Sequence, residues 1–180
     1  MIDKILKAKH WQLFILMGTC VIFQFVSCQS SVEKTTKGIN KDGYTISYPS
    51  HLKLDESGQM GTKFLLFTEK TGLDDDFVEN INLVIQDLEA DFGLDEFVKL
   101  SESQIKDNGK LISSEGIKDK NSEFHKMILS ANVNNSDLKF IQYCFVKDNK
   151  AYVLTFTAKE DEFEKYAVEM EEIMQTFELK

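Results

Sequence analysis

Apolar and polar residues alternate with the two-residue period of a β-strand along much of the chain after residue 42. In Tyr44–Pro49, aromatic or aliphatic residues take every second position, and the only proline of the chain ends the run. Further segments have apolar or alternating patterns of strand length: 62–69, 79–88, 110–115, 122–133, 139–147 and 152–157. We therefore expect three early strands and a later group of three or four.

Two segments change to the period of about 3.6 residues that is typical of an amphipathic α-helix. The first is Leu94–Lys106, which has acidic residues in its first turn and is followed by an Asn-Gly pair. The second lies near the end of the chain, where an apolar stripe runs from Phe163 to Phe177. For this helix the sequence predicts a capping box, with Thr157 as the N-cap residue and Glu160 at position N3.

This order of elements predicts an α+β domain, in which helices pack on a mostly antiparallel sheet. The segment Asp137–Phe177 contains two apolar strands, a tight polar turn and the closing helix, so we expect the core to be built against it. The sequence divides into a leader (1–27), a polar tether that we expect to be flexible (28–41) and a single domain (42–180).

The leader has the pattern of a secretory signal peptide. Three lysines lie within residues 1–10, and Trp11–Val26 is an apolar run with few interruptions. The run is shorter than the about 20 residues that a spanning helix needs, although an uncleaved signal anchor remains the alternative.

The end of this run, Phe25-Val26-Ser27-Cys28, resembles the lipobox of bacterial lipoproteins. The resemblance implies cleavage before Cys28 and acylation of its thiol, and several acyl chains hold a protein in a membrane more firmly than one. The segment that ends in Cys20 is a poorer competing site. Gln29 after the cysteine, by resemblance to Gram-negative sorting signals, favours the outer membrane.

The charge of the chain limits the classes of partner. The formal net charge is -9, and every basic residue is a lysine. Nucleic acids and anionic membrane surfaces require clustered cations, so we expect neither as the main partner. The absence of arginine also removes bidentate capture of phosphate or carboxylate groups.

Candidate chemical groups are few after residue 28. His51, His125 and Cys144 are far apart in sequence and form no CxxC or HxxxH motif, so we expect no transition-metal site. Cys144 and His125 could form a thiol–imidazole pair. However, Cys144 lies between two aromatic residues in a predicted strand, and we expect its thiol to be buried and inert.

The acidic run Asp74–Asp76 offers oxygen ligands suited to Ca²⁺. It lacks the spacing and the glycine of an EF-hand loop, so a solvated charge run is the expected interpretation. The chain also has no nucleophile elbow, phosphate loop or dinucleotide-binding motif. We therefore expect no enzyme, catalytic residue or cofactor, and a hydrolase with an unrecognised site is the remaining alternative.

The opening segment Gly43–Pro49 (GYTISYP), the strands that begin at Phe140 and Ala151, and the helical stripe Phe163–Phe177 resemble the corresponding parts of PsbP-like domains. The resemblance covers about residues 40–178. It implies an α/β/α sandwich, a central antiparallel sheet with helices on both faces. It further implies docking onto other proteins, generally without catalysis, and no functional residue carries over.

Together these patterns lead to two hypotheses. The first is a membrane-tethered, non-enzymatic cell-envelope lipoprotein that acts through contact with an unidentified envelope protein. The second is an envelope carrier or sensor that binds a small apolar ligand or Ca²⁺ in a cleft between sheet and helix. The many Phe and Tyr residues could line such a cleft, or could simply form the core.

Overall fold

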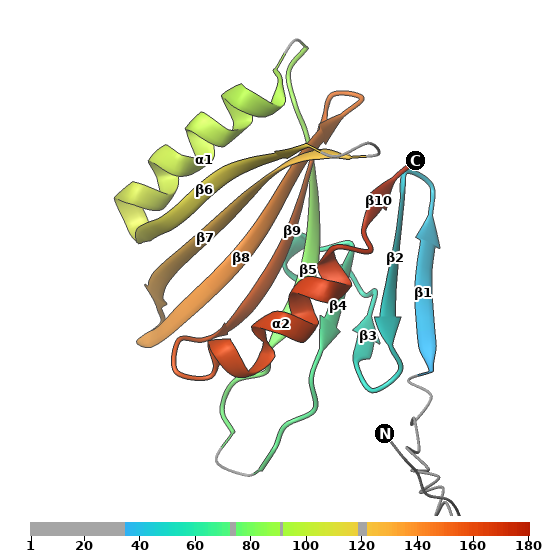
Figure 1. Cartoon of the computed structure of the whole chain (residues 1–180), viewed down its shortest axis with the longest axis vertical. Coiled ribbons are helices and arrows are strands. Elements are labelled where there is room, and N and C mark those ends of the chain that lie inside the picture. Colours follow the sequence, from blue (N-terminus) through green and yellow to red (C-terminus); the bar gives the residue numbers. More distant parts are fainter. Residues whose placement is uncertain (1–34, 73–74, 91, 119–121) are drawn as a thin grey trace, which may run out of the picture. The chain divides into compact units, whose positions relative to one another are not determined.

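The computed structural model describes residues 35–72, 75–90, 92–118 and 122–180 (Figure 1). Along the chain the elements are β1 (Thr36–Lys41), β2 (Tyr44–Pro49), β3 (Lys53–Asp55), a short 3₁₀ turn (Gln59–Gly61), β4 (Phe64–Phe67), β5 (Asn80–Asp87), α1 (Leu94–Asn108), β6 (Lys110–Lys118), β7 (Glu123–Val133), β8 (Ser136–Lys147), β9 (Lys150–Lys159), α2 (Phe163–Met174) and β10 (Glu178–Leu179). The predicted signal peptide and Cys28 lie outside the described residues. Within those residues, no helix is long and apolar enough to cross a membrane.

The strands form two antiparallel sheets. The larger has seven strands in the order β3-β4-β5-β9-β8-β7-β6, and the smaller has three in the order β1-β2-β10. Two-residue loops join β7 to β8 and β8 to β9, and all four loop residues, Asn134, Asn135, Asp148 and Asn149, have positive φ angles of 50–65°. Asn and Asp tolerate this left-handed conformation, which matches the twist of a hairpin. The tight polar turn predicted within Asp137–Phe177 is therefore confirmed.

The two helices lie on opposite faces of the large sheet (Figure 1). Successive residues of β8 show this, because Tyr143 and Phe145 belong to the core beneath α2, whereas Cys144 belongs to the core beneath α1. The small sheet packs on the α2 side, since Ile46 and Tyr48 join the same core. The predicted α/β/α sandwich is confirmed, with the small sheet as an addition that was not predicted.

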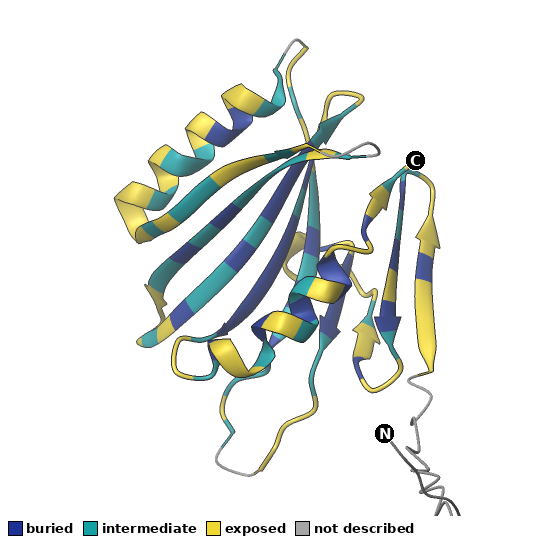
Figure 2. Cartoon of the chain, viewed as in Figure 1, coloured by how far each residue is buried: buried dark blue, intermediate teal, exposed yellow. Residues whose placement is uncertain are grey.

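Buried residues concentrate on the central strands and on the inner face of α2 (Figure 2). Phe156 and Leu154 of β9 are fully buried, and so is Met170 of α2. Phe177, just after α2, links the parts of this core, because its ring stacks on Tyr44 at 5.7 Å and lies 5.1 Å from the ring of Phe145. Most of the core is thus built against β8, β9 and α2, as the sequence predicted.

Strand β1 corrects the predicted extent of the tether. Thr36–Lys41 pairs with β2 along its whole length, and Ile39 is buried between neighbours that are exposed. The segment was predicted to be flexible because a single apolar residue gives no periodic pattern. Its order comes from the partner strand, which supplies the hydrogen bonds.

The predicted start of the second helix is also wrong. Strand β9 continues to Lys159, and Thr157 is a buried residue of that strand, paired with Asn80 and Phe140. It therefore cannot cap a helix. Helix α2 begins at Phe163, and its N-cap residue Glu162 makes no side-chain cap hydrogen bond.

Most other differences concern element length. Strand β4 is shorter than predicted and β6 is longer, while β3 and β10 are too short to give a pattern. Helix α1 extends two residues beyond the predicted Lys106 and ends before Gly109. These changes leave the order of elements as predicted.

Candidate functional site

Neither helix covers its face of the large sheet completely. Helix α1 packs over β6, β7 and β8, whereas α2 packs over β8, β9 and β2. Each helix is thus offset toward a different edge, and a groove remains beside each one. We call these the α1-side groove, over β5, β9 and β8, and the α2-side groove, over β6, β7 and β8.

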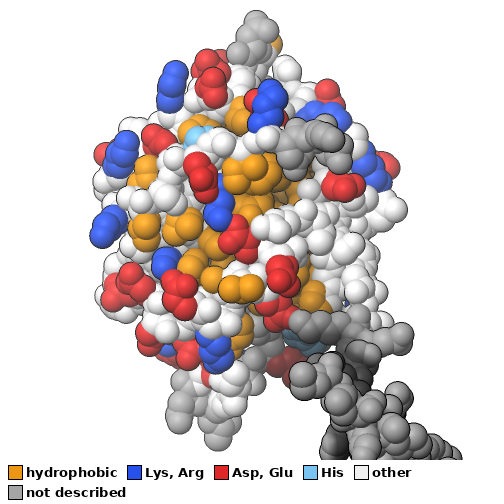
Figure 3. Space-filling view, viewed as in Figure 1, with side chains coloured by type: hydrophobic (Ala, Val, Ile, Leu, Met, Phe, Trp, Pro, Cys, Tyr) orange, Lys and Arg blue, Asp and Glu red, His pale blue; other side chains and the backbone are white. Residues whose placement is uncertain are grey.

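The α2-side groove has a volume of about 920 Å³ and an aromatic floor. The ring of Phe124 lies 4.6 Å from that of Tyr143 and 5.1 Å from that of Phe145. Ile117 of β6 and Leu179 of β10, both half-buried, extend the apolar surface to the two sides. Figure 3 shows hydrophobic side chains gathered in a hollow on this face, with acidic and basic side chains around them.

A charged pair crosses the wall of the α2-side groove. Lys126 of β7 pairs with Glu171 of α2, and their side chains are only 15% and 24% exposed. The hydroxyl of Tyr143 donates a hydrogen bond of 2.7 Å to the same carboxylate. Burial, and next the carboxylate of Glu171, raise the pKa of Tyr143 well above its usual value, so it remains a neutral donor. The network fixes α2 on the sheet and places polar groups within an otherwise apolar surface.

His125 and Cys144 are neighbours, as the weighed thiol–imidazole pair would require, but the thiol is not reactive. The two residues are direct partners across β7 and β8. Cys144 is 1% exposed, and burial raises the pKa of its thiol to about 12. Cys144 is therefore buried, as predicted, and is protonated at neutral pH.

The imidazole of His125 contacts a serine instead. Its Nε2 lies 2.6 Å from Oγ of Ser114, which donates a 2.5 Å hydrogen bond to Glu102 of α1. No sequence pattern indicated this cluster, which depends on the irregular pairing of β6 with β7. None of the three side chains lines either groove. The contact joins α1 to the sheet.

His51 lies elsewhere, in the turn after β2. Its side chain is half exposed, and its Nε2 is 3.6 Å from the carboxylate of Glu169 on α2. The structure therefore does not bring the two histidines together in one site. Among the described residues, no group of three or more His, Cys, Asp or Glu side chains is arranged to hold a metal ion.

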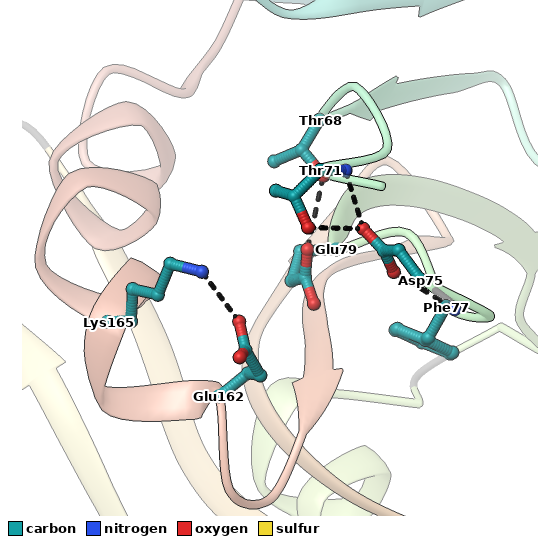
Figure 4. Close-up of polar contacts among 7 residues, drawn as sticks. All are labelled: Thr68, Thr71, Asp75, Phe77, Glu79, Glu162 and Lys165. Atoms are coloured by element: carbon teal, nitrogen blue, oxygen red, sulfur yellow. Dashed lines mark hydrogen bonds and ion pairs between the residues drawn. The ribbon is translucent and has the colours of Figure 1, made fainter. Parts of the chain in front are cut away.

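The described part of the acidic run uses its carboxylates for internal contacts (Figure 4). Asp75 accepts hydrogen bonds from the backbone N–H and hydroxyl of Thr71 and from the N–H of Phe77. The N–H of Thr71 is the main cause of a lowered pKa at Asp75. Asp76 pairs with Lys159, and that contact lowers its pKa as well. Asp74 lies outside the described residues.

The close-up shows two more contacts on this side of the domain (Figure 4). Thr68 donates a 3.1 Å hydrogen bond to the buried carboxylate of Glu79, and Lys165 donates one of 2.8 Å to Glu162. Local partners thus satisfy the carboxylates of Glu79 and Glu162, as they do those of Asp75 and Asp76. The contacts of Asp75, Asp76 and Glu79 give the loop that contains them a structural role.

The sequence matches no protein-family model and no curated protein. The fold, in contrast, is found among solved structures. The cyanobacterial PsbP protein (CyanoP) of Synechocystis sp. PCC 6803 is similar with a TM-score of 0.59 and 14% identity, over 86% of this chain and 98% of that one. The domain has the PsbP-like fold.

Two other solved structures are also similar to this PsbP-like domain. LpqN of Mycobacterium tuberculosis, described as involved in cell envelope biogenesis, has a TM-score of 0.58 and 11% identity, over 81% of this chain and 91% of that one. The Ran-binding protein Mog1p of Saccharomyces cerevisiae has a TM-score of 0.54 and 10% identity, over 81% and 96%. At such identities the likeness establishes the fold alone.

Proposed function

We propose that this chain is a lipid-anchored, non-enzymatic module of the bacterial cell envelope, and that its PsbP-like domain binds another protein through the α2-side groove. The observation that carries the proposal is the groove's aromatic floor. Phe124 and Ile117 are only partly buried there, whereas the apolar residue Met127 of β7 is fully buried. Apolar side chains gathered in a hollow on one face are typical of a surface that a partner covers.

The composition of the groove favours a protein as that partner. Aromatic side chains are enriched at protein interfaces, and here Phe124 lines the hollow. Charged residues of both signs, including Glu123 and Lys147, lie around the apolar centre. An apolar centre with a polar rim is the usual arrangement of residues that dominate binding energy.

The remaining chemistry supports a role without catalysis. The thiol of Cys144 is buried and protonated, and the hydroxyl of Ser114 donates a hydrogen bond to Glu102 of α1. The described carboxylates of the acidic run are satisfied by their own neighbours. The hydroxyl and the carboxylates thus have structural partners, and the buried thiol is not ionised.

The proposed location rests on the sequence before the domain. The apolar run and Cys28 together fit a processed lipoprotein, and Gln29 favours the outer membrane of a Gram-negative cell. Only six residues lie between Cys28 and Thr35, the first described residue, so a fully extended connection of seven Cα–Cα steps reaches about 25 Å. The proposed partner therefore lies at or close to the membrane surface.

The interaction can be tested by comparing two charge substitutions in the full chain. Phe124→Asp places a carboxylate on the floor of the α2-side groove, and Ile117→Asp does so at its edge. Val168→Asp is the matched control, because Val168 is 71% exposed on α2 and does not line the groove. After cross-linking in intact cells, mass spectrometry should recover one envelope protein with the wild type and the control, at about tenfold lower yield with either groove variant.

The melting temperature of each variant shows whether it is folded. Equal recovery of that protein by the groove variants and the control would contradict the proposed interface. Recovery of only abundant bystander proteins by the wild type would contradict the interaction itself.

A further inference from the structure

The α1-side groove differs in chemistry from the rest of the surface. It has a volume of about 770 Å³ and lies between α1 and the strands β5, β9 and β8. None of the described residues that line it is charged, although 28% of the residues in the chain are. We propose that this groove binds an uncharged, hydroxyl-bearing ligand, namely a segment of a neutral saccharide.

A row of polar side chains crosses the floor of the groove. Asn82, Thr155 and Gln142 are direct partners across β5, β9 and β8, and all three line the groove. Two inter-strand spacings make the row about 10 Å wide. Each residue in it can both donate and accept hydrogen bonds, and none carries a charge.

The hydrogen bonds within this row are long. Nε2 of Gln142 is 3.4 Å from Oγ of Thr155, and Nδ2 of Asn82 is also 3.4 Å from the amide oxygen of Asn80. A strong hydrogen bond of this type is about 2.9–3.0 Å. The two amides therefore keep most of their hydrogen-bonding capacity for a group that enters the groove.

An uncharged polar row is unusual for central strands. On the other face of the same strands, Leu83, Leu154 and Tyr143 are buried in the core. A face that served only as core would be apolar in the same way, whereas a face left to water would carry charge, as Lys110 and Lys118 of β6 do. Amides and hydroxyls suit a surface that becomes covered by a polar ligand, because covering a charge is far more costly.

Apolar side chains from the helix and the sheet form the walls of the groove. Leu100 of α1 is 50% exposed, and Ile105 and Phe140 are half-buried. Apolar walls with a few convergent polar groups are typical of small-molecule sites. Sugar rings present hydroxyl groups at their edges and C–H groups on their faces. The hydroxyl groups can bond to the polar row on the floor, and the C–H groups can pack against the apolar walls.

Other classes of ligand fit this groove less well. A fully apolar chain would cover Asn82 and Gln142 without giving them hydrogen-bond partners, which is unfavourable. An acidic or basic ligand would find no opposite charge among the described lining residues. Saccharide binding is independent of the protein contact proposed for the α2-side groove, since the two surfaces lie on opposite faces of the sheet.

The test uses the full chain, purified in a zwitterionic detergent so that no glycoside detergent competes. An array of neutral malto-, cello-, manno- and chito-oligosaccharides is probed beside acidic oligosaccharides and uncharged peptides. At least one neutral oligosaccharide should bind more strongly than both of the other classes. Its affinity is then measured by titration calorimetry.

Two variants that keep side-chain volume assign the binding to the row. Gln142→Leu and Thr155→Val should each weaken the affinity about tenfold, since each removes hydrogen bonds to the ligand while the melting temperature stays equal or rises. Gln175→Leu, an amide substitution on the α2 side, should leave the affinity unchanged. No binding of neutral oligosaccharides, stronger binding of acidic ones or of peptides, or full affinity in both row variants would overturn the proposal.

Discussion

The network at the wall of the α2-side groove gives the most specific stability prediction. Glu171→Leu removes the carboxylate that both Lys126 and Tyr143 contact. The buried Tyr143 hydroxyl then loses its acceptor, which costs about 1–3 kcal/mol. Lys126 loses its partner in a position only 15% exposed. Breaking a fully buried pair costs about 3–5 kcal/mol, and the remaining exposure reduces this to about 1–2 kcal/mol.

We therefore expect Glu171→Leu to lower the free energy of unfolding by about 3 kcal/mol. In a domain of this size that corresponds to a fall of about 10 °C in melting temperature. Urea unfolding followed by circular dichroism measures the first quantity, and a thermal scan measures the second. Tyr143→Phe alone should cost about 1 kcal/mol, and combining it with Glu171→Leu should cost less than the sum of the two, because they share one hydrogen bond.

The matched control is Glu123→Leu. Glu123 pairs with Lys118 at 2.9 Å, but these side chains are 62% and 74% exposed. Such a surface pair contributes about 0–1 kcal/mol, so the control should lie close to the wild type. If Glu171→Leu were no more destabilising than Glu123→Leu, the network would not fix α2 on the sheet as described.

Three further predictions concern titration, reactivity and the anchor. Asp75 and Asp76 have folded-state pKa values below the ordinary 3.8, so their stabilising effect is present above about pH 4 and is lost as the pH falls through the folded-state values. Melting temperatures measured from pH 5 downwards should therefore fall less steeply in the Asp75→Asn, Asp76→Asn double variant than in the wild type. Parallel curves for the two proteins would refute this prediction. Peptide mapping after iodoacetamide treatment at pH 8 should find Cys144 unmodified in the native chain and modified in guanidinium chloride, because burial raises its pKa to about 12; modification of the native chain would mean that the thiol is accessible. Metabolic labelling with palmitate should be lost in Cys28→Ser, and labelling that persists would exclude Cys28 as the lipidated residue.

The sequence predicted elements that have their own periodic pattern. Strand β2 lies where predicted because Tyr44, Ile46 and Tyr48 face one core while the residues between them do not. Helix α1 was found for the equivalent reason at helical spacing. Strand β1 was missed because Ile39 is its only buried residue and its order comes from β2. The start of α2 was misplaced because pairing across the sheet keeps Thr157 in β9.

The grooves were less predictable than the fold. The sequence indicated that aromatic residues could line a cleft between sheet and helix, but the clefts result from the offset of each helix toward one edge of the sheet. Asn82, Gln142 and Thr155 become one row only through the register of three strands that are distant in sequence. The contact of Ser114 with His125 likewise depends on a bulge in β6. Neither arrangement leaves a pattern within a single segment.

Site-specific photo-cross-linking in intact cells tests the central claim most directly. A benzophenone amino acid at position 124 reports on the floor of the α2-side groove, and the same group at position 168 reports on the exposed surface of α2 outside it. If this groove binds an envelope protein, light should produce one discrete adduct of defined mass from position 124 and none of that mass from position 168. The absence of any adduct at position 124, or the same adduct at both positions, would contradict the account.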